Sequence, residues 1–400
     1  MICLVNPNNR VPSPFSAVEP PLWLGLIAGD QIDKGQDVVI IDAEAESLTV
    51  EETVSRVNDL RPKETIIVVM GANPSVSSTP KMPVAKKLLR QMNARLTGIH
   101  PIALKYPNTI VKPFEGCPSV PWGLLPMDKY IAHNWHCLGR ERKPYAVLYT
   151  SLNCPYSCLY CNVHTLYGDR KMRYRPMKDV FQELDYFAEQ GIRNIKIWDE
   201  LFCLNETRVD IICDYIVETE YDFNIWAYAR VDTVNLGMLF KMKKAGINWL
   251  CYGFESTEEV KQQVNKKTTA QETQEAIEMT RNAGISIIAN FIFGLPGDTL
   301  DNMKATLDMA IRENFEYVNF YVALPYPGSE WYESLKKKPI DWGSFSQFSP
   351  NICASPEVVK FRDEAFKTYF NRPEYLNMIE KKFGARKHIQ EMLKWSIRKP

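Results

Sequence analysis

The chain has 400 residues, of which 45% are hydrophobic and 12% aromatic, so it is long and apolar enough for two or three folded domains and is not a disordered protein. Lysine plus arginine equals aspartate plus glutamate at 48 each, so no overall charge would attract nucleic acid or an anionic membrane. No apolar run reaches membrane-spanning length, and the amino terminus lacks the pattern of a signal peptide. Ten scattered cysteines are typical of a reducing compartment, so we expect a cytoplasmic protein.

Residues 1–112 are expected to form an open parallel α/β domain of the Rossmann-like type, whose ligands bind beyond the carboxyl edge of the sheet. Residues 96–115 are too few for full fourth and fifth strands with their helix, so the domain is predicted to be shortened. Strands are predicted at residues 2–7, 37–42 and 65–71, helices near residues 20–34, 51–61 and 84–95, and a short further segment at residues 97–104.

Residues 113–145 form a predicted linker rich in proline and tryptophan. Within it His133, His136 and Cys137 could ligate a metal. Three ligands on a loop without a fourth are a weak metal signal, so a structural or cofactor-packing role is the favoured interpretation and a metal site is the alternative.

Residues 146–325 repeat a strand and a helix six times, which predicts a parallel sheet with right-handed crossovers. The strands show little polar alternation, as expected of strands buried on both faces. The repeat alone does not distinguish a partial barrel from an open, doubly wound sheet. Strands are predicted at residues 146–152, 194–200, 223–231, 249–256, 286–294 and 317–325, and among the helices are 180–191, 238–246 and 273–284, ending at Gly191, Gly246 and Gly284 in the left-handed conformation.

Residues 326–400 are expected to form a carboxy-terminal helical cap that completes the core. Amphipathic helices are predicted at residues 358–370, 375–384 and 388–397. Such a cap would also shield the mouth of an incomplete barrel from water. Tyr321, Tyr326 and Ser329 are therefore predicted to line a substrate pocket.

Three cysteines in one loop, Cys154, Cys158 and Cys161, are the most informative motif. Three thiolates can bind three irons of a cubane iron–sulfur cluster and leave the fourth iron open. A zinc ribbon would normally show a second Cys-x-x-Cys pair, and none of the other seven cysteines pairs in that way. A structural or zinc-binding loop is the alternative.

This loop, with Tyr160 directly before its last cysteine, resembles the cluster loop of the radical S-adenosylmethionine (radical SAM) superfamily. The resemblance implies a 4Fe-4S cluster at the mouth of a six-stranded partial (β/α)6 barrel, which favours the barrel over the open sheet. It also implies that SAM binds the open iron and is cleaved by one electron to methionine and a 5′-deoxyadenosyl radical. That radical would remove a hydrogen atom from an unactivated carbon, while the protein orients the substrate.

The predicted SAM contacts lie at the carboxyl ends of the barrel strands, where the chemistry of such barrels collects. Acidic residues after the second strand would accept hydrogen bonds from the methionine ammonium, and polar groups after the fourth would suit the ribose hydroxyls. A buried Arg230 needs a partner, which could be the SAM carboxylate, Asp199 or Glu255. For each residue, simple capping of a strand is the alternative. The predicted set is Tyr160, Asp199, Glu200, Arg230, Glu255, Ser256, Gly294 and Leu295.

The first domain resembles the cobalamin-binding domain that precedes the barrel in cobalamin-dependent radical SAM proteins. The loop at residues 71–78 and the turn at residues 98–101 look like its cofactor-facing loops. The chain departs from that pattern because it has no Asp-x-His-x-x-Gly segment and is shortened, so a degenerate domain kept as a scaffold is the alternative. The predicted cobalamin contacts are Asn6, Asn73, Ser75, Ser77, Gly98 and His100.

The leading hypothesis from the sequence is a cobalamin-dependent methyltransferase that acts on an unactivated carbon of a small metabolite. One SAM would methylate cobalamin and a second would generate the substrate radical. One alternative is a radical SAM mutase, epimerase, dehydratase or cyclase with a vestigial first domain, and another is a catalytically silent iron–sulfur protein. The expected partners are a small-molecule substrate and an external electron donor such as flavodoxin or ferredoxin, without nucleic acid or membrane.

Overall fold

The computed structural model describes residues 1–9, 13–71, 78–335 and 354–396. The chain divides into two units that interleave along the sequence. The described part of the first unit comprises residues 1–9, 13–71, 78–131, 143–183 and 325–335, and that of the second comprises residues 132–142, 184–324 and 354–396. The domain boundaries expected from the sequence stay a prediction.

The first unit contains a four-stranded parallel sheet with the order β2-β1-β3-β4. Apolar side chains of the strands, such as Val5 and Ile67, pack with Val54 and Leu88 of two helices to form the core of this unit. The elements are β1 (Ile2–Asn6), α1 (Leu22–Asp33), β2 (Val38–Asp42), α2 (Val50–Leu60), β3 (Glu64–Val68), α3 (Met82–Leu89), β4 (Arg95–Thr97) and α4 (Ile99–Ala103).

This arrangement confirms the predicted open parallel α/β fold. All three predicted strands and all three predicted helices form within a few residues of their expected positions. The fourth strand, β4, has only three residues, in keeping with the expectation of a shortened domain.

The first unit also contains short elements that precede and follow the cysteine loop in the sequence. Helix α4 contacts α5 (His164–Tyr167), the short helix that follows the third cysteine. The other elements are β5 (Tyr145–Leu148), β6 (Ser151–Leu152), its antiparallel partner β7 (Arg173–Tyr174), the start of α6 (Met177–Glu189) and α12 (Glu330–Ser334).

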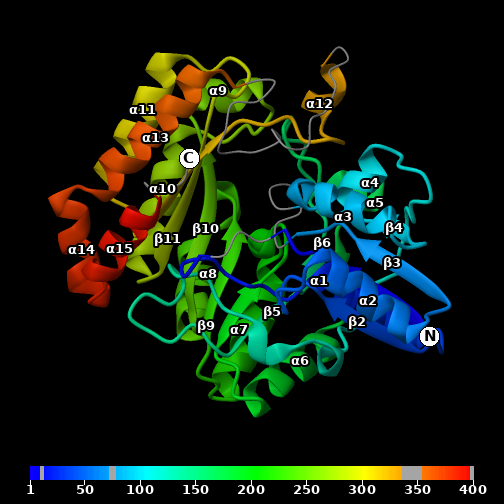
Figure 1. Cartoon of the computed structure of the whole chain (residues 1–400). Helices are drawn as coiled ribbons and strands as arrows, with labels where there is room; N and C mark the ends of the chain where they lie inside the picture. The colour runs from blue at the N-terminus through cyan, green and yellow to red at the C-terminus, as the bar shows by residue number, and fades with distance from the viewer. Residues whose placement is uncertain (10–12, 72–77, 336–353, 397–400) are drawn as a thin grey trace. The chain divides into compact units, whose positions relative to one another are not determined.

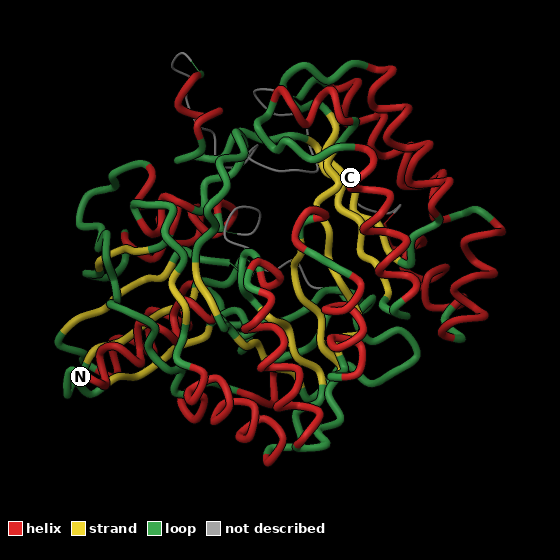
Figure 2. The backbone as a smooth tube through the Cα atoms, turned by 180° about the vertical axis from the view of Figure 1, so that it is seen from behind, coloured by secondary structure: helices red, strands yellow, loops and turns green. Residues whose placement is uncertain are grey.

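The second unit is built on parallel strands in the order β12-β11-β10-β9-β8. Helices cover one face of this sheet, since α8 contacts β10, α10 and α11 contact β11, and α13 contacts β12. Figure 1 shows α11, α13, α14 and α15 along one side of the strands, and in Figure 2 these helices are red beside the yellow strands. The strands are β8 (Asn194–Ile197), β9 (Asn224–Ala229), β10 (Ile247–Glu255), β11 (Ser286–Phe293) and β12 (Tyr317–Val322).

The helices of this unit alternate with the strands and then continue as a carboxy-terminal group. They are α7 (Glu206–Glu218), α8 (Leu236–Lys244), α9 (Glu258–Gln263), α10 (Ala270–Asn282), α11 (Leu300–Glu313), α13 (Pro356–Phe370), α14 (Pro373–Phe383) and α15 (Arg386–Ser396). Gly191, Gly246 and Gly284 have positive φ, as predicted for left-handed helix ends. The three helices predicted after residue 357 are α13, α14 and α15, so the helical carboxy-terminal region is confirmed.

The other face of the second sheet, here called the open face, is only partly buried. On the helix-covered face the strand residues are buried, whereas on the open face half-exposed residues recur with the period of two that a strand imposes. The expectation of strands buried on both faces is therefore wrong for this part of the sheet. The half-exposed residues are Tyr228, Gly253, Asn290, Ile292, Asn319 and Tyr321.

The amino ends of the strands on the open face are closed by the loop at residues 132–142. Trp135 lies edge-on to Trp226 of β9 and Trp249 of β10, with ring centroids 5.0 and 5.9 Å apart. His133 stacks on Trp135, and His136 Nε2 lies 2.8 Å from the Asn224 carbonyl oxygen. These contacts give the loop histidines the structural role that was favoured over a metal site.

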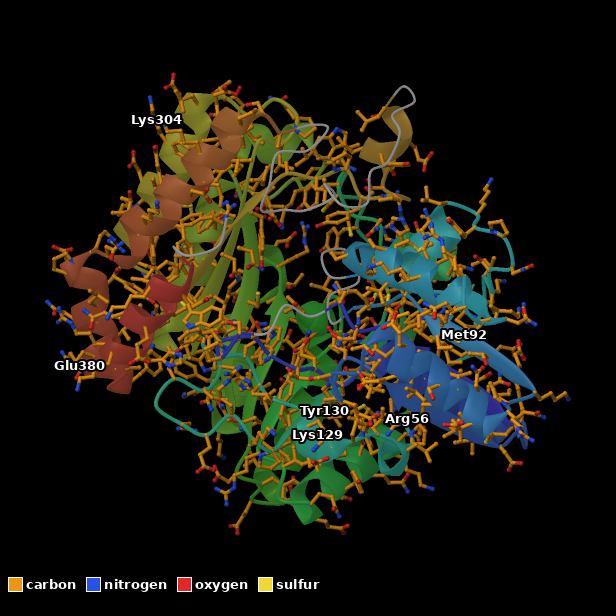
Figure 3. The ribbon with its side chains drawn as sticks, viewed as in Figure 1. Arg56, Met92, Lys129, Tyr130, Lys304 and Glu380 are labelled. Carbon is orange, nitrogen blue, oxygen red and sulfur yellow. The ribbon has the colours of Figure 1, made fainter. Side chains whose placement is uncertain are left out.

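No helix in the described residues is long and apolar enough to cross a membrane. The charged residues Lys304 of α11 and Glu380 of α14 are exposed and are labelled in Figure 3.

Candidate functional site

The start of the cysteine loop is held by Asn153. This residue has a φ of 79°, in the left-handed region that asparagine tolerates better than most residues. Its Oδ1 accepts the Cys154 N–H at 2.9 Å, and its Nδ2 donates to the carbonyl oxygens of Asp169 at 2.8 Å and Lys171 at 3.0 Å. The buried amide therefore ties the first cysteine to the far end of the loop.

His164 bridges the interior of the same loop. Its Nε2 lies 2.7 Å from the carbonyl oxygen of Tyr156, between the first two cysteines, and its Nδ1 lies 3.3 Å from Asn153 Oδ1. The Cys161 N–H donates to the Cys158 carbonyl at 3.0 Å and closes a tight turn. The spacing of the second and third cysteines is thus fixed by the backbone itself.

The segment after β12 lies along the outside of the loop. The Trp331 N–H donates to the carbonyl oxygen of Leu159 at 2.9 Å, and Asn162 Nδ2 donates to that of Pro327 at 3.0 Å. The Thr165 hydroxyl donates to the Gly328 carbonyl at 3.3 Å. Contacts on both sides therefore organise the loop in the described structure.

Two residues of this segment were predicted to line a substrate pocket, and the structure shows what Ser329 does. The buried Ser329 hydroxyl accepts the Tyr332 N–H at 3.1 Å and donates to the Tyr326 carbonyl at 2.7 Å. It therefore caps α12. The side chain of Tyr326 is buried as well. A substrate contact for Tyr321, Tyr326 or Ser329 stays a prediction.

We expect Gly328→Ala to loosen this segment. Gly328 has a φ of 88°, and a Cβ there would lie 2.1 Å from Thr165 Oγ1. The variant should lose about 1 kcal/mol of unfolding free energy from the backbone conformation and roughly 1–3 kcal/mol more from crowding. Urea denaturation would measure the loss, with Gly168→Ala as the control, because Gly168 has a φ of 71° and no atom within 4 Å of its would-be Cβ. Equal losses for the two variants would contradict the tight contact.

The donor set of the loop fits an iron–sulfur cluster. The three cysteines are half-buried thiols, not halves of disulfides. In the described residues, no group of three or more His, Cys, Asp or Glu side chains is gathered as a single metal ion would require. A cubane does not require such a group, because each thiolate binds a different iron. Cys154, Cys158 and Cys161 are the residues that would hold it.

Most of the predicted SAM contacts lie at one edge of the second sheet. Its strands are parallel, so their carboxyl ends share an edge. Asp199 and Glu200 follow β8, Arg230 follows β9, and Glu255 ends β10. Gly294 and Leu295 follow β11. Glu200 and Gly294 are half-exposed, whereas the others at this edge are buried: Asp199, Arg230, Glu255, Ser256 and Leu295. Tyr160, in the cysteine loop, is half-buried.

Arg230 has a protein partner that the sequence analysis did not name. Its guanidinium forms two hydrogen bonds of 2.9 Å with the Asp232 carboxylate, and Nη2 donates to the Lys266 carbonyl oxygen at 3.0 Å. Asp232 was not among the partners expected from the sequence, and its carboxylate, two residues away, reaches the guanidinium directly.

Glu255 is paired with Lys266, at 2.6 Å between Oε1 and Nζ, and both side chains are less than 10% exposed. The pairing of β10 with β11 is irregular here, and Glu255 has a φ of 63°. A Cβ on Gly253 would lie 2.3 Å from the Glu255 carboxylate and 2.8 Å from Lys266 Nζ. Gly253 therefore leaves room for the ion pair, and neither the irregular pairing nor Lys266 was predicted.

The carboxyl group of Asp298, in the loop after β11, should make the stability of the folded protein depend on pH. Burial raises its pKa from 3.8 to about 6, although the Gly294 N–H donates to Oδ2 at 2.8 Å. Between these two values the folded protein binds more protons than the unfolded chain, so this residue makes stability fall as pH rises. We expect Asp298→Asn to remove that slope and to be more stable than the wild type at pH 7. Urea unfolding across this range measures it, and an unchanged slope, or the same change in the exposed control Asp301→Asn, would contradict the assignment.

The predicted cobalamin contacts in the first unit have roles within the protein. Asn6 donates to Asp42 Oδ1 at 2.7 Å and accepts from Lys81 Nζ at 2.8 Å. Gly98 has a φ of 111° and lies against Val69, whose carbonyl oxygen would be 2.2 Å from a Cβ.

His100 is 1% exposed, and burial lowers its pKa to about 3. Asn6, Gly98 and His100 are thus buried, and a contact of any of them with cobalamin stays a prediction. Asn73, Ser75 and Ser77 lie outside the described residues.

Comparison with known proteins identifies the part of the chain that contains the cysteine loop. Residues 148–310 match the family described as the radical SAM superfamily. This part of the chain is a radical SAM domain. An uncharacterized methyltransferase of Pyrococcus horikoshii is 25% identical to the chain over 419 residues, which cover 89% of each chain. The anaerobic magnesium-protoporphyrin IX monomethyl ester cyclase of Rubrivivax gelatinosus is 25% identical over 221 residues, which cover 54% of this chain and 38% of the cyclase.

Among solved structures, the chain resembles the radical SAM methyltransferase TsrM from Kitasatospora setae, determined with cobalamin and a 4Fe-4S cluster bound. The TM-score is 0.62 at 16% sequence identity, and the match covers 82% of this chain and 76% of TsrM. This likeness and the strand orders above confirm the predicted fold class, an open parallel α/β part followed by a second set of parallel strands and a helical end.

Proposed function

We propose that this radical SAM protein is a cobalamin-dependent methyltransferase that acts on an unactivated carbon of a small molecule. The observation that carries the proposal is the three-cysteine loop, held on both sides by the chain's own hydrogen bonds, within a sequence that aligns along 89% of its length with a methyltransferase. The methyl transfer itself is inferred from such relatives.

The residues of the chain would serve this chemistry by binding and orientation. Cluster and SAM together supply the one-electron cleavage of a SAM carbon–sulfur bond. The three thiolates would hold the cluster, and Asn153 and His164 would fix the loop that carries them. At the edge of the second sheet, Glu200 and the backbone of Gly294 are accessible to SAM. The partly exposed Arg230–Asp232 pair and the buried Glu255–Lys266 pair would hold that edge rigid.

The cobalamin part of the proposal rests on the relatives and not on residue contacts. The described residues predicted to touch cobalamin are buried in the first unit's own contacts, so no methyl-transfer step is derived from them. Cobalamin would carry the methyl group. The first sheet has the open parallel topology whose carboxyl edge commonly binds ligands, which supports a cofactor at that edge.

The partners of the proposed enzyme follow from the same chemistry. The cluster must be reduced by an external donor, which we propose is a flavodoxin or a ferredoxin. The absence of a basic excess in the sequence supports a small molecule over a nucleic acid as substrate. The ten scattered cysteines support a location in the cytoplasm.

Anaerobic reconstitution of the full chain with iron and sulfide, with and without cobalamin, tests this function. The reconstituted protein is incubated with SAM and a reductant, and the products are measured. The expected result is 5′-deoxyadenosine in both samples and S-adenosylhomocysteine only in the sample with cobalamin. A cluster-loaded protein that never cleaves SAM would contradict the proposal and favour a catalytically silent iron–sulfur protein.

A second candidate is radical chemistry without methyl transfer, such as ring formation. It is favoured by the similarity to the cyclase of Rubrivivax gelatinosus over about half of this chain. The same experiment separates the two, because 5′-deoxyadenosine without S-adenosylhomocysteine supports the second.

A further inference from the structure

The open face of the second sheet carries a pair of amides in otherwise apolar strands. Asn290 of β11 and Asn319 of β12 are directly opposite each other in the parallel register, so their side chains lie on the same face. Asn319 Nδ2 donates to Asn290 Oδ1 at 2.9 Å, and Asn290 Nδ2 donates to the sulfur of Cys251 on β10 at 3.1 Å. A chain of three polar groups therefore crosses three adjacent strands.

The two amides keep hydrogen-bonding capacity to spare. Each carboxamide has two donor hydrogens and an acceptor oxygen, and each uses one hydrogen in the chain just described. Both residues are half-exposed, and in the described residues no protein group uses the Asn319 carbonyl oxygen or the second hydrogen of either amide. If the nitrogen and oxygen of both amides exchanged places, the direction of donation along the chain of hydrogen bonds would reverse. Donors and an acceptor would still be exposed. Burial raises the pKa of Cys251 to about 12, so its thiol is neutral.

The surroundings of the pair limit what can bind it. Tyr228 and Tyr321 are half-exposed on the same face, on the strands that flank β10 and β11, and aromatic rings favour flat, apolar ligands. At the carboxyl edge, Arg230 is paired with Asp232 and Glu255 with Lys266, and the half-exposed carboxylate of Glu200 would disfavour an anionic ligand.

Lys196 is buried toward the other end of the face, 4.9 Å from the centre of the Trp226 ring. Its ammonium is therefore covered, and the two neutral amides supply exposed polar atoms beside the tyrosines.

We infer that Asn290 and Asn319 determine substrate specificity, and that they take a neutral, planar molecule with a donor–acceptor edge such as a carboxamide or a nitrogen heterocycle. The inference rests on the proposed function, in which the substrate lies against the radical SAM strands. A site built to hydrogen-bond such an edge rejects a ligand that cannot pair with it, because polar groups would be left unsatisfied.

Ligand-observed saturation-transfer NMR on the reconstituted full chain tests the inference with two matched pairs of probes. Nicotinamide and benzamide carry the amide edge, and nicotinate and benzoate replace it with a carboxylate. We expect the amides to bind the wild type about tenfold or more tightly than the carboxylates. Stronger binding of the carboxylates, or no binding of either amide, would overturn the inference.

Substitutions of Asn319 test whether the amide probes bind at this pair of residues. Asn319→Asp keeps the shape of the side chain and replaces the donor with a charged acceptor, and Asn319→Leu removes both groups. Each should abolish amide binding, while Asn302→Leu, which removes a half-buried asparagine on α11, should leave it unchanged. Amide binding that survives both Asn319 variants, or that is lost in the Asn302 control as well, would overturn the inference.

The cluster spectrum and SAM cleavage are recorded on the same samples. If cluster and SAM cleavage are present and the amides do not bind, the substrate class is wrong and the proposed function stands. If the amides bind as expected and no SAM is cleaved, the binding site stands and the proposed function is wrong.

Discussion

Cys158→Ala will abolish assembly of the cluster and, with it, cleavage of SAM. Removal of one of three thiolates leaves two irons without a protein ligand, because no fourth cysteine follows in the loop. The rate of 5′-deoxyadenosine formation should fall to the uncatalysed background, about six orders of magnitude or more below that of a typical enzyme. Iron content and product analysis by mass spectrometry after anaerobic reconstitution measure both effects.

The matched control for this variant is Cys117→Ala. Cys117 is half-buried like the loop cysteines but lies outside the motif, so the control should keep its iron and its activity. Full iron content in Cys158→Ala, or equal loss of iron in the two variants, would show that the loop does not hold the cluster.

Lys266→Met will strongly destabilise the second unit. The substitution leaves the Glu255 carboxylate buried without its cation, and breaking a buried pair in this way costs about 3–5 kcal/mol. We expect a loss of that size in the free energy of unfolding, measured by chemical denaturation. The exposed neighbour Lys267, which also has a positive φ, provides the control Lys267→Met, and its loss should be below about 1 kcal/mol.

A double-mutant cycle separates the pair from general damage to the fold. Glu255→Gln combined with Lys266→Met removes both charges, and replacement of both partners of a buried pair is far less costly than replacement of one. The double variant should therefore recover much of the lost stability. Additive losses would mean that the two side chains do not act as a pair.

Periodicity and glycine placement were sufficient to predict most of the fold from sequence. The six strands after residue 145 and the three after residue 1 lie close to their predicted positions, because short β-rich runs separated by amphipathic segments are a strong local signal. The prediction was less complete where the signal is short, as for the three-residue strand β4.

The candidate site was only partly predictable. The cysteine spacing is local in sequence and could be read directly. The partner of Glu255 could not be predicted from the sequence. The pair depends on a positive φ at Glu255, on an irregular pairing of β10 with β11 and on a lysine in a separate loop. The same holds for the contacts that hold the cysteine loop, since Asn162 reaches a carbonyl 165 residues further along the chain.

The open face shows a different limit of prediction from sequence. Strands rich in Val, Ile, Phe and Tyr read as buried on both sides, and the single asparagine in each of β11 and β12 was not recognised as part of a face. Only the register of the two strands brings Asn290 and Asn319 together.

Mössbauer spectroscopy of the full chain, reconstituted with isotopically enriched iron and measured before and after addition of SAM, tests the central claim most directly. The account predicts a cubane cluster in which one iron of four changes its spectrum when SAM binds, because three thiolates leave that iron open to the ligand. A sample without a cubane, or a cubane in which every iron is insensitive to SAM, would contradict it.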